Sequence, residues 1–150
     1  MKKLILISVI CLIFIAGCTP IAPVDAHSLL GASDSELVSA RGEGQISSYR
    51  MGDEEFIHQR KYDEEMFGLN AIVEYLYSDE QRVAQIVATF PEVNEDELVN
   101  AVSSNLGAKP VTLQKESDEY DFLAHWEKDG VVWISRRIPN SALYVLIENQ

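Results

Sequence analysis

The stretch Ser33-Asp34-Ser35-Glu36-Leu37-Val38-Ser39-Ala40 returns 61 residues later as Asn94-Glu95-Asp96-Glu97-Leu98-Val99-Asn100-Ala101. Each copy begins with a residue whose side chain can cap a helix and carries a glutamate three positions on, the pattern of a capping box. Leucine and valine follow where a core-facing side would lie. The first helix is expected to end at Gly42 and Gly44, and the second at Gly107, with Pro110 beyond it.

The same spacing recurs in a pair of strands. Residues 72–77 and 82–90 have the composition of two strands around the turn Ser78-Asp79-Glu80. Residues 133–138 and those from Leu143 onward repeat this around Pro139-Asn140-Ser141. Because helix and hairpin keep one offset, we infer a tandem duplication, with a first unit at 33–91 and a second at 92–150.

Each unit has room for two more strands between its helix and its hairpin. They are predicted at 45–51 and 56–62 in the first unit and at 111–115 and 121–126 in the second. Asp129-Gly130 is a two-residue hairpin signal that joins 120–128 to 131–137. The fold class is therefore α+β: two tandem repeats, each a short helix followed by a mostly four-stranded antiparallel sheet.

A unit of about 60 residues is marginally stable alone, so the two should share a core or a continuous sheet. The predicted core positions are Leu37, Val73, Tyr75, Ile86, Ala88, Phe90, Leu98, Val102, Phe122, Val132, Ile134, Val145 and Ile147.

The N-terminus has the pattern of a lipoprotein signal. Lys2 and Lys3 precede an uncharged run at 4–16, which ends in the lipobox Ile15-Ala16-Gly17-Cys18. As a helix the run covers roughly 20 Å, against the ~30 Å of a hydrocarbon core, which argues against the alternative of an uncleaved anchor. We expect a signal peptide at 1–17, fatty acids such as palmitate on Cys18, and a flexible tether at 18–32.

Lipidation predicts a membrane attachment on the outer side of the cytoplasmic membrane. If the cell has two membranes, Thr19 in place of aspartate favours the outer membrane, facing the periplasm. Cys11 falls within the signal and Cys18 carries lipid, so no disulfide is expected.

Charge limits the partners. Residues 18–150 contain all 24 acidic residues but only ten of the 12 basic ones, a net charge of −14. Nucleic acid is disfavoured because binding to phosphate needs a basic face. The acidity is explained either by solubility or by a basic protein partner.

Motifs for catalysis and metal binding are missing. The chain has no Gly-x-Ser-x-Gly elbow and no His-Glu-x-x-His pair among His27, His58 and His125. His58 with Asp63, Glu64 and Glu65 could form an oxygen-rich metal site, and a solvated turn is the alternative. We expect no catalytic activity, no cofactor and no metal.

Aromatic residues alternate with polar ones in the predicted strands, and in a helix-backed sheet one face can stay open. We predict a surface that binds a partner protein, because tyrosine and tryptophan are enriched at binding hot spots. Its residues are Tyr75, Tyr77, Trp126, Trp133 and Tyr144, with the basic pair Arg136 and Arg137. The alternatives are that the aromatics fill the core, or that they bind a small ligand or saccharide on an open face.

A lipobox and a tether followed by helix-plus-sheet units resemble two groups of proteins, and the likeness of the folded part covers residues 33–150. These are the BamE-type outer-membrane lipoproteins and the tandem-repeat fold of β-lactamase inhibitory protein. Leu106-Gly107-Ala108-Lys109-Pro110 is similar to a Leu-Gly-x-Pro stretch after the helix of such units, with one extra residue. The resemblance implies protein binding, in envelope assembly or enzyme inhibition, although this chain lacks the disulfides of the inhibitory protein.

Overall fold

The structure, a computed structural model, describes residues 25–115, 122–137 and 141–150. The predicted signal peptide, the lipobox with Cys18, and part of the predicted tether lie outside these ranges. So do residues 116–121, between the strands predicted at 111–115 and 121–126, and most of the turn predicted at 139–141. The described elements are η1 (Ala26–Leu29), α1 (Asp34–Arg41), β1 (Gln45–Met51), β2 (Glu54–Met66), β3 (Leu69–Tyr77), β4 (Val83–Phe90), α2 (Glu95–Leu106), β5 (Thr112–Lys115), β6 (Phe122–Lys128), β7 (Val131–Arg137) and β8 (Leu143–Asn149).

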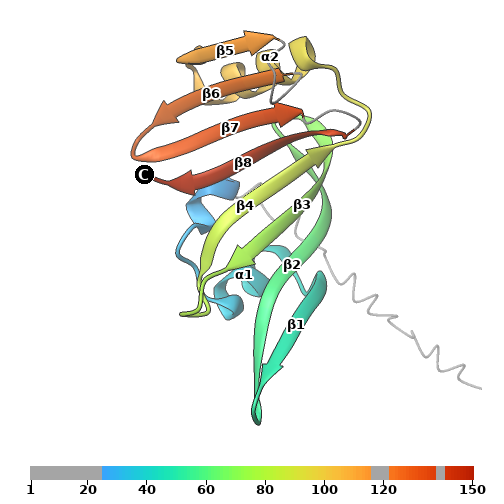
Figure 1. Ribbon diagram of the computed structural model, residues 1–150, viewed down its shortest axis with the longest axis vertical. Coiled ribbons are helices and arrows are strands. Elements are labelled where there is room, and N and C mark those ends of the chain that lie inside the picture. Colours follow the sequence, from blue (N-terminus) through green and yellow to red (C-terminus); the bar gives the residue numbers. More distant parts are fainter. Residues whose placement is uncertain (1–24, 116–121, 138–140) are drawn as a thin grey trace, which may run out of the picture.

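The eight strands form one antiparallel sheet in the order β1-β2-β3-β4-β8-β7-β6-β5. The α+β class is therefore confirmed. The centre of the sheet is the pairing of β4 with β8, from Gln85 opposite Glu148 to Phe90 opposite Leu143. The helices lie together on one face, behind the strongly twisted sheet in Figure 1. The opposite face carries no described helix.

Both long helices begin and end where their caps predict. Ser33 Oγ accepts the Glu36 backbone N–H, and the Glu36 carboxylate accepts the Ser33 backbone N–H at 2.7 Å. Asn94 Oδ1 accepts the Glu97 backbone N–H at 3.0 Å. These bonds satisfy amides that the first turn of a helix leaves without partners. Gly107, with φ 64°, ends α2 in the left-handed conformation.

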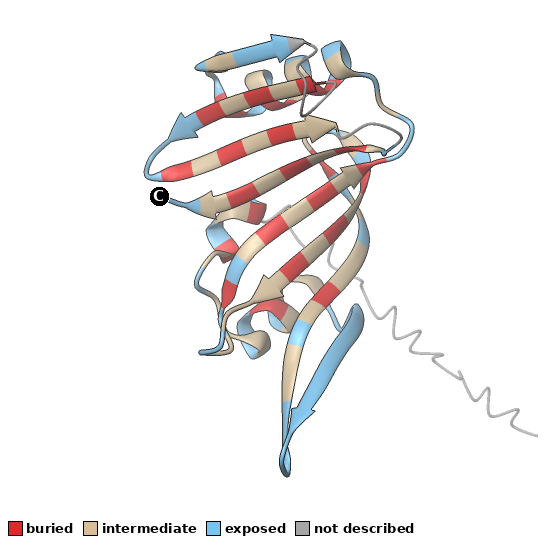
Figure 2. Cartoon of the chain, viewed as in Figure 1, coloured by how far each residue is buried: buried red, intermediate tan, exposed pale blue. Residues whose placement is uncertain are grey.

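One hydrophobic cluster runs through the whole molecule between the helices and the sheet. Leu37 from α1 and Leu98 and Val102 from α2 are fully buried in it. Along the central strands buried and half-buried residues alternate, as the banding in Figure 2 shows. This is the period-two pattern of a sheet with one covered face.

Two predicted core residues are wrong. Val132 and Ile134 are half-buried on the helix-free face, whereas Val131, Trp133 and Ser135 of β7 face the core. Residues 131–134 are all apolar, so the alternation of side chains does not show which set points inward. Shifting the phase by one residue exchanges the two faces. The other predicted core positions are buried.

β2 extends beyond its predicted end at residue 62. It continues to Met66 because β3 pairs with it as far as the turn, where Met66 lies opposite Leu69. Phe67 and Gly68 make that turn with φ of 57° and 78°. The sequence prediction ended the strand too early because residues 63–65 are Asp63-Glu64-Glu65, and aspartate and glutamate are uncommon in strands.

The flexible tether predicted at 18–32 is corrected for residues 25–32. These form η1 and its connection to α1, with Ala26 and Leu29 buried in the core. The Gly31 N–H donates to the Val83 carbonyl at 2.7 Å, and the Val83 N–H donates to the Ala32 carbonyl at 2.9 Å. Within the described part of the chain, none of the helices has the length and apolarity needed to cross a membrane.

Candidate functional site

The predicted aromatic surface does not form one face. Trp126 is fully buried, Trp133 is 2% exposed and Tyr75 is fully buried, all on the helix-covered side. Trp126 lies opposite Trp133 across β6 and β7, and its indole N–H donates to Ser103 Oγ of α2 at 3.1 Å. The prediction that these three bind a partner is therefore wrong for this fold, and they fill the core instead. A saccharide stacked on open tryptophans loses its support for the same reason.

The remaining predicted residues are half-buried and divided between two faces. Tyr144 and Arg136 lie opposite each other on the helix-free face. Arg137 points to the other side, where its guanidinium contacts Glu95 of α2 at 3.2 Å. Adjacent strand residues point to opposite faces, so the Arg136-Arg137 pair cannot form one basic spot. Tyr77 lies on the helix side, where its hydroxyl contacts Asp34.

The helix-free face is apolar along the middle of the sheet. Val87, Leu146 and Ile134 are directly paired across β4, β8 and β7. Glu74 continues this row on one side and His125 on the other. All five side chains are half-buried, which is what neighbouring strands alone produce on an uncovered sheet.

β1 is the most exposed strand of the sheet. All seven of its residues are exposed, including Ile46 at 52%, Tyr49 at 43% and Met51 at 67%. Tyr49 stacks on Phe56 of β2 with ring centroids 5.6 Å apart. The β1–β2 hairpin projects beyond the rest of the sheet, and β1 is pale blue along its whole length in Figure 2. One backbone edge of β1 pairs with β2, and the other pairs with no described strand.

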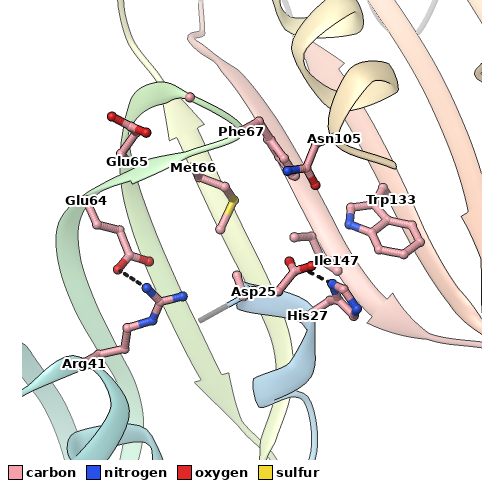
Figure 3. Close-up of a pocket in the computed structure, with 12 residues that line it drawn as sticks. Asp25, His27, Arg41, Glu64, Glu65, Met66, Phe67, Asn105, Trp133 and Ile147 are labelled. Atoms are coloured by element: carbon pink, nitrogen blue, oxygen red, sulfur yellow. Dashed lines mark ion pairs between the residues drawn. The ribbon is translucent and has the colours of Figure 1, made fainter. Parts of the chain in front are cut away.

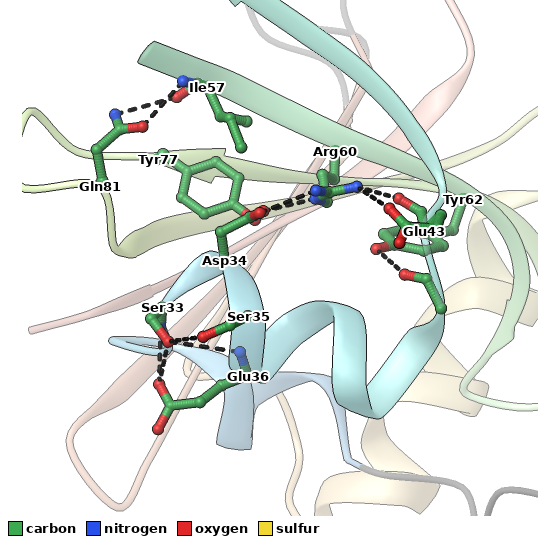
Figure 4. Close-up of polar contacts among 11 residues, drawn as sticks. Ser33, Asp34, Ser35, Glu36, Glu43, Ile57, Arg60, Tyr62, Tyr77 and Gln81 are labelled. Carbon is green, nitrogen blue, oxygen red and sulfur yellow. Dashed lines mark hydrogen bonds and ion pairs between the residues drawn. The ribbon is translucent and has the colours of Figure 1, made fainter. Parts of the chain in front are cut away.

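A buried ion pair fixes α1 against the base of this hairpin. The Arg60 side chain of β2 is 5% exposed and makes two bonds to the Asp34 carboxylate, at 2.5 and 2.8 Å. Its guanidinium also donates to the Glu43 carbonyl. The Tyr77 hydroxyl donates to Asp34 at 2.6 Å, so α1, β2 and β3 meet at one carboxylate (Figure 4).

The charges in this network reinforce one another. The hydrogen bond from Arg60 holds the pKa of Asp34 below its usual value, against the opposing effect of burial. The same bond raises the pKa of Arg60. Burial, followed by the bond to Asp34, raises the pKa of the Tyr77 hydroxyl. At neutral pH Asp34 and Arg60 are therefore charged, while Tyr77 stays a neutral hydroxyl donor, and the three together hold the hairpin in place.

A second network binds the hairpin to the β3–β4 turn. Gln81, with φ 57°, accepts the Ile57 N–H at 2.9 Å and donates to the Ile57 carbonyl at 3.2 Å. The side-chain amide therefore pairs with β2 as another strand would (Figure 4). The register between β1 and β2 shifts beside it, leaving His58 as the extra residue.

A cavity of about 310 Å³ opens on the helix side of the sheet. It lies between η1, the end of α1, the β2–β3 turn, the end of α2, and strands β7 and β8 (Figure 3). Its polar end is the ion pair of Arg41 with Glu64, 3.4 Å apart. Its other side is built from Met66, Phe67, Trp133 and Ile147, with the pair Asp25 and His27 at the rim.

Two pairs of polar side chains line this cavity and differ in exposure: Arg41 with Glu64 is mostly buried, whereas His27 and Asp25 are 35% and 58% exposed. The Arg41 and Glu64 side chains are 15% and 16% exposed, and Glu64 also accepts the Tyr75 hydroxyl at 3.0 Å. Burial, and then the nearby Glu64 carboxylate, raises the pKa of Tyr75. His27 Nδ1 lies 2.9 Å from the Asp25 carboxylate, and the His27 ring packs edge-on to Trp133 at 5.6 Å.

A second hollow, of about 530 Å³, lies against β2 and β3 and shares Glu64 and Glu65 with the first. Its other acidic residues are Asp63 and Glu92. Within the ranges that the structure describes, no group of three or more histidine, aspartate or glutamate side chains is arranged to hold a metal ion.

Comparison with known proteins shows only distant structural likenesses. No protein-family model matches the chain. No characterised protein matches it in sequence. The fold is similar to a DUF4309 family protein (YjgB) from Bacillus subtilis subsp. subtilis strain 168, with a TM-score of 0.46, 10% identity, and coverage of 79% of this chain and 78% of the other.

An extracellular protein containing an SCP domain, from Bacillus anthracis strain Ames, is similar with a TM-score of 0.44 and 9% identity. That likeness covers 86% of this chain and 47% of the other. Likenesses as weak as these two identify neither a family nor a function.

Proposed function

We propose that this chain is a lipid-anchored, non-catalytic module of a bacterial cell envelope that binds a partner protein along strand β1. The observation that carries the proposal is the exposure of β1 over all seven of its residues, with apolar side chains at Ile46, Tyr49 and Met51. Natural edge strands are usually short, covered or charged, since a free edge invites pairing. Here the only charged residue in the strand is Arg50.

The binding mode that fits this edge is the addition of a strand. An extended partner segment would form backbone hydrogen bonds with β1, and alternate side chains would contact the apolar ones. The ion pair of Arg60 with Asp34 and the bonds of Gln81 to Ile57 hold the hairpin before the partner arrives. Such preorganisation lowers the entropic cost of binding.

Charge indicates a basic partner segment. Glu43, Asp53, Glu54 and Glu55 flank or face β1, and each is exposed. The whole chain has a net charge of −12, which speeds encounter with a basic partner and opposes the approach of a second copy. We therefore propose an extended, lysine- or arginine-containing segment of another protein as the occupant.

Lipidation would hold this edge near a membrane. The lipobox supports attachment through Cys18 on the outer side of the cytoplasmic membrane, or on the outer membrane of a cell with two membranes. Asp25, the first described residue, is seven positions further on, a reach of about 23 Å when extended. The folded part would thus stay close to the lipid surface.

We also propose that the chain arose by tandem duplication. The sequence repeat supports this, as does the order of elements: α1 precedes β1 to β4, and α2 precedes β5 to β8. The two groups of four strands meet at β4 and β8, with β1 and β5 at the outer edges. Of these two edges, β1 is the longer.

A peptide-binding experiment tests the binding edge. A labelled peptide of alternating lysine and valine, matched in length to β1, should bind the purified protein in a fluorescence-anisotropy titration. Met51→Lys should weaken binding about tenfold, because it replaces an apolar contact with a like charge. Val111→Lys is the matched control, since Val111 is 62% exposed near the opposite edge. Equal binding of a glutamate–valine peptide, or equal effects of both variants, would contradict the proposal.

Two measurements in cells test the protein partner at β1 and the lipid anchor on Cys18. A photo-crosslinking residue at Tyr49 should give a discrete adduct with another protein, and one at Leu113 on β5 should not. An adduct of two copies of this chain would overturn the choice of a different partner. Mass spectrometry should find fatty acids on Cys18, and Cys18→Ala should release the protein from membranes.

A further inference from the structure

We infer that the 310 Å³ cavity between η1, α1, α2 and the sheet binds a small organic amine, a cation with a short apolar or aromatic body. This inference does not depend on a protein partner at β1. The cavity lies on the helix-covered side of the sheet, and β1 does not line it. Its volume is at the lower end of the range for small-molecule sites, which run from about 300 to 1,000 Å³.

The apolar side of the cavity fits the body of such a ligand. Met66, Trp133 and Ile147 are 6%, 2% and 1% exposed, so they are held in place by the core while lining the space. Phe67 closes the side next to the β2–β3 turn, where its ring stacks near Phe90 at 6.4 Å. Rigid aromatic and aliphatic walls of this kind bind apolar groups without ordering first.

The charges of the cavity select a cation. The cavity contains the carboxylates of Asp25 and Glu64 against the guanidinium of Arg41; Arg41 pairs with Glu64, so the carboxylate left at the rim is that of Asp25. An anion would add to the excess of negative charge, whereas an ammonium group would offset it.

The aromatic groups at the rim favour the same charge. The face of a tryptophan ring attracts a cation within about 6 Å, and the attraction grows as water is excluded. Trp133 lines the cavity beside His27, whose ring packs edge-on to it at 5.6 Å, and the Asp25 carboxylate lies against the same histidine (Figure 3). A carboxylate beside an aromatic ring is a common way to hold an ammonium group, and here the apolar wall continues inward from it.

The position of Arg41 sets the orientation of the ligand. Arg41 pairs with Glu64 at the far end of the cavity, on the side of α1. A bound cation is repelled from that end, so its charge should lie toward Asp25, with the apolar body between Met66 and Ile147.

Three probes of one shape test the charge preference. Phenethylamine is the cation, phenylalanine the zwitterion and 3-phenylpropionate the anion. Each is titrated into the full-length protein by calorimetry and by the fluorescence of Trp133, with Trp126 as a constant background. We expect phenethylamine to bind and 3-phenylpropionate to bind at least about tenfold more weakly. Preferential binding of the anion, or no binding of the amine up to millimolar concentration, would overturn the inference.

Variants then locate the site. Asp25→Asn removes an exposed carboxylate at the rim, so it should not unfold the protein. It should weaken phenethylamine binding up to about fivefold, the effect of one partly exposed charge. Glu65→Gln, whose carboxylate points away from the cavity in Figure 3, and Asp53→Asn, at the tip of the β1–β2 hairpin, are the matched controls and should change nothing. An equal effect of all three would show that the amine responds only to net charge, which would refute a site in this cavity.

Discussion

Replacing Asp34 with alanine tests whether the ion pair with Arg60 holds the hairpin. The guanidinium of Arg60 is 5% exposed and would lose both bonds to the carboxylate, while the Tyr77 hydroxyl would lose its acceptor. Removing one partner of a buried ion pair costs about 3 to 5 kcal/mol, because the other charge stays buried without compensation. Asp34 itself is 30% exposed, so water can reach the gap and the lower end applies. We expect a loss of about 3 kcal/mol.

Urea unfolding at pH 7, followed by tryptophan fluorescence, measures this loss. Both tryptophans lie in β6 and β7, far along the sheet from Arg60. Their transition moves with the Asp34→Ala variant only if the sheet unfolds as one unit. For an m-value of about 2 kcal/mol/M, the midpoint should fall by about 1.5 M. Asp79→Ala, in the exposed β3–β4 turn, is the control and should stay within about 0.5 kcal/mol of the original protein.

The double variant Asp34→Ala with Arg60→Met separates the ion pair from simple packing. Methionine removes the uncompensated charge and keeps an apolar stem, so most of the lost stability should return. A loss below about 1 kcal/mol for Asp34→Ala, the value of a surface pair, would refute the reasoning. So would a double variant that is less stable than the single one.

Three further predictions concern stability. Because Arg60 lowers the pKa of Asp34, the stabilisation from this carboxylate is complete above its ordinary pKa near 4 and disappears as the pH falls through the lowered folded value. The difference in unfolding free energy between the original protein and Asp34→Ala should therefore be constant from about pH 5 to 7 and smaller at about pH 3, by urea titration. Gly44→Ala should cost about 2 kcal/mol or more in urea titrations, because φ is 61° and a Cβ would lie 2.6 Å from the Tyr62 ring. Gly52→Ala, with φ 69° and open space, should cost only about 1 kcal/mol, and equal costs would contradict the clash. Ser135→Ala should leave the thermal midpoint unchanged or higher, since Ser135 Oγ is buried and has no hydrogen-bond partner among the described residues. A lower midpoint would mean that Ser135 has one.

Much of the secondary structure could be predicted because its signals are local. Ser33 and Asn94 begin helices whose first amides they satisfy within three residues, and Gly107 ends α2 with a positive φ. Asp129 and Gly130 both have positive φ, as a two-residue hairpin requires. Each of these features depends on a few neighbouring residues, so the sequence contains all that is needed.

The candidate sites were only partly predictable. The strand at 45–51 was predicted with the bounds of β1. Its exposure could not be predicted, because it depends on which other elements pack near that edge of the sheet. The cavity is built from residues of several elements that are far apart in sequence. Trp133 was predicted to be functional for its aromatic ring, but it was assigned to the open face. Residues 131–134 are all apolar, so the sequence did not show which side chains of β7 point toward the core.

The sequence by itself determined where the helices begin and end, where the hairpins turn, and that the chain is antiparallel α+β with a large negative charge. Only the tertiary structure decided that Trp133 faces inward and Ile134 outward, that β4 joins β8, and that residues 25–32 pack into the core. The physical reason is the range of the interactions. Caps and turns satisfy backbone groups within a few residues, whereas the choice of a face or a strand partner depends on burying apolar area against residues distant in the chain.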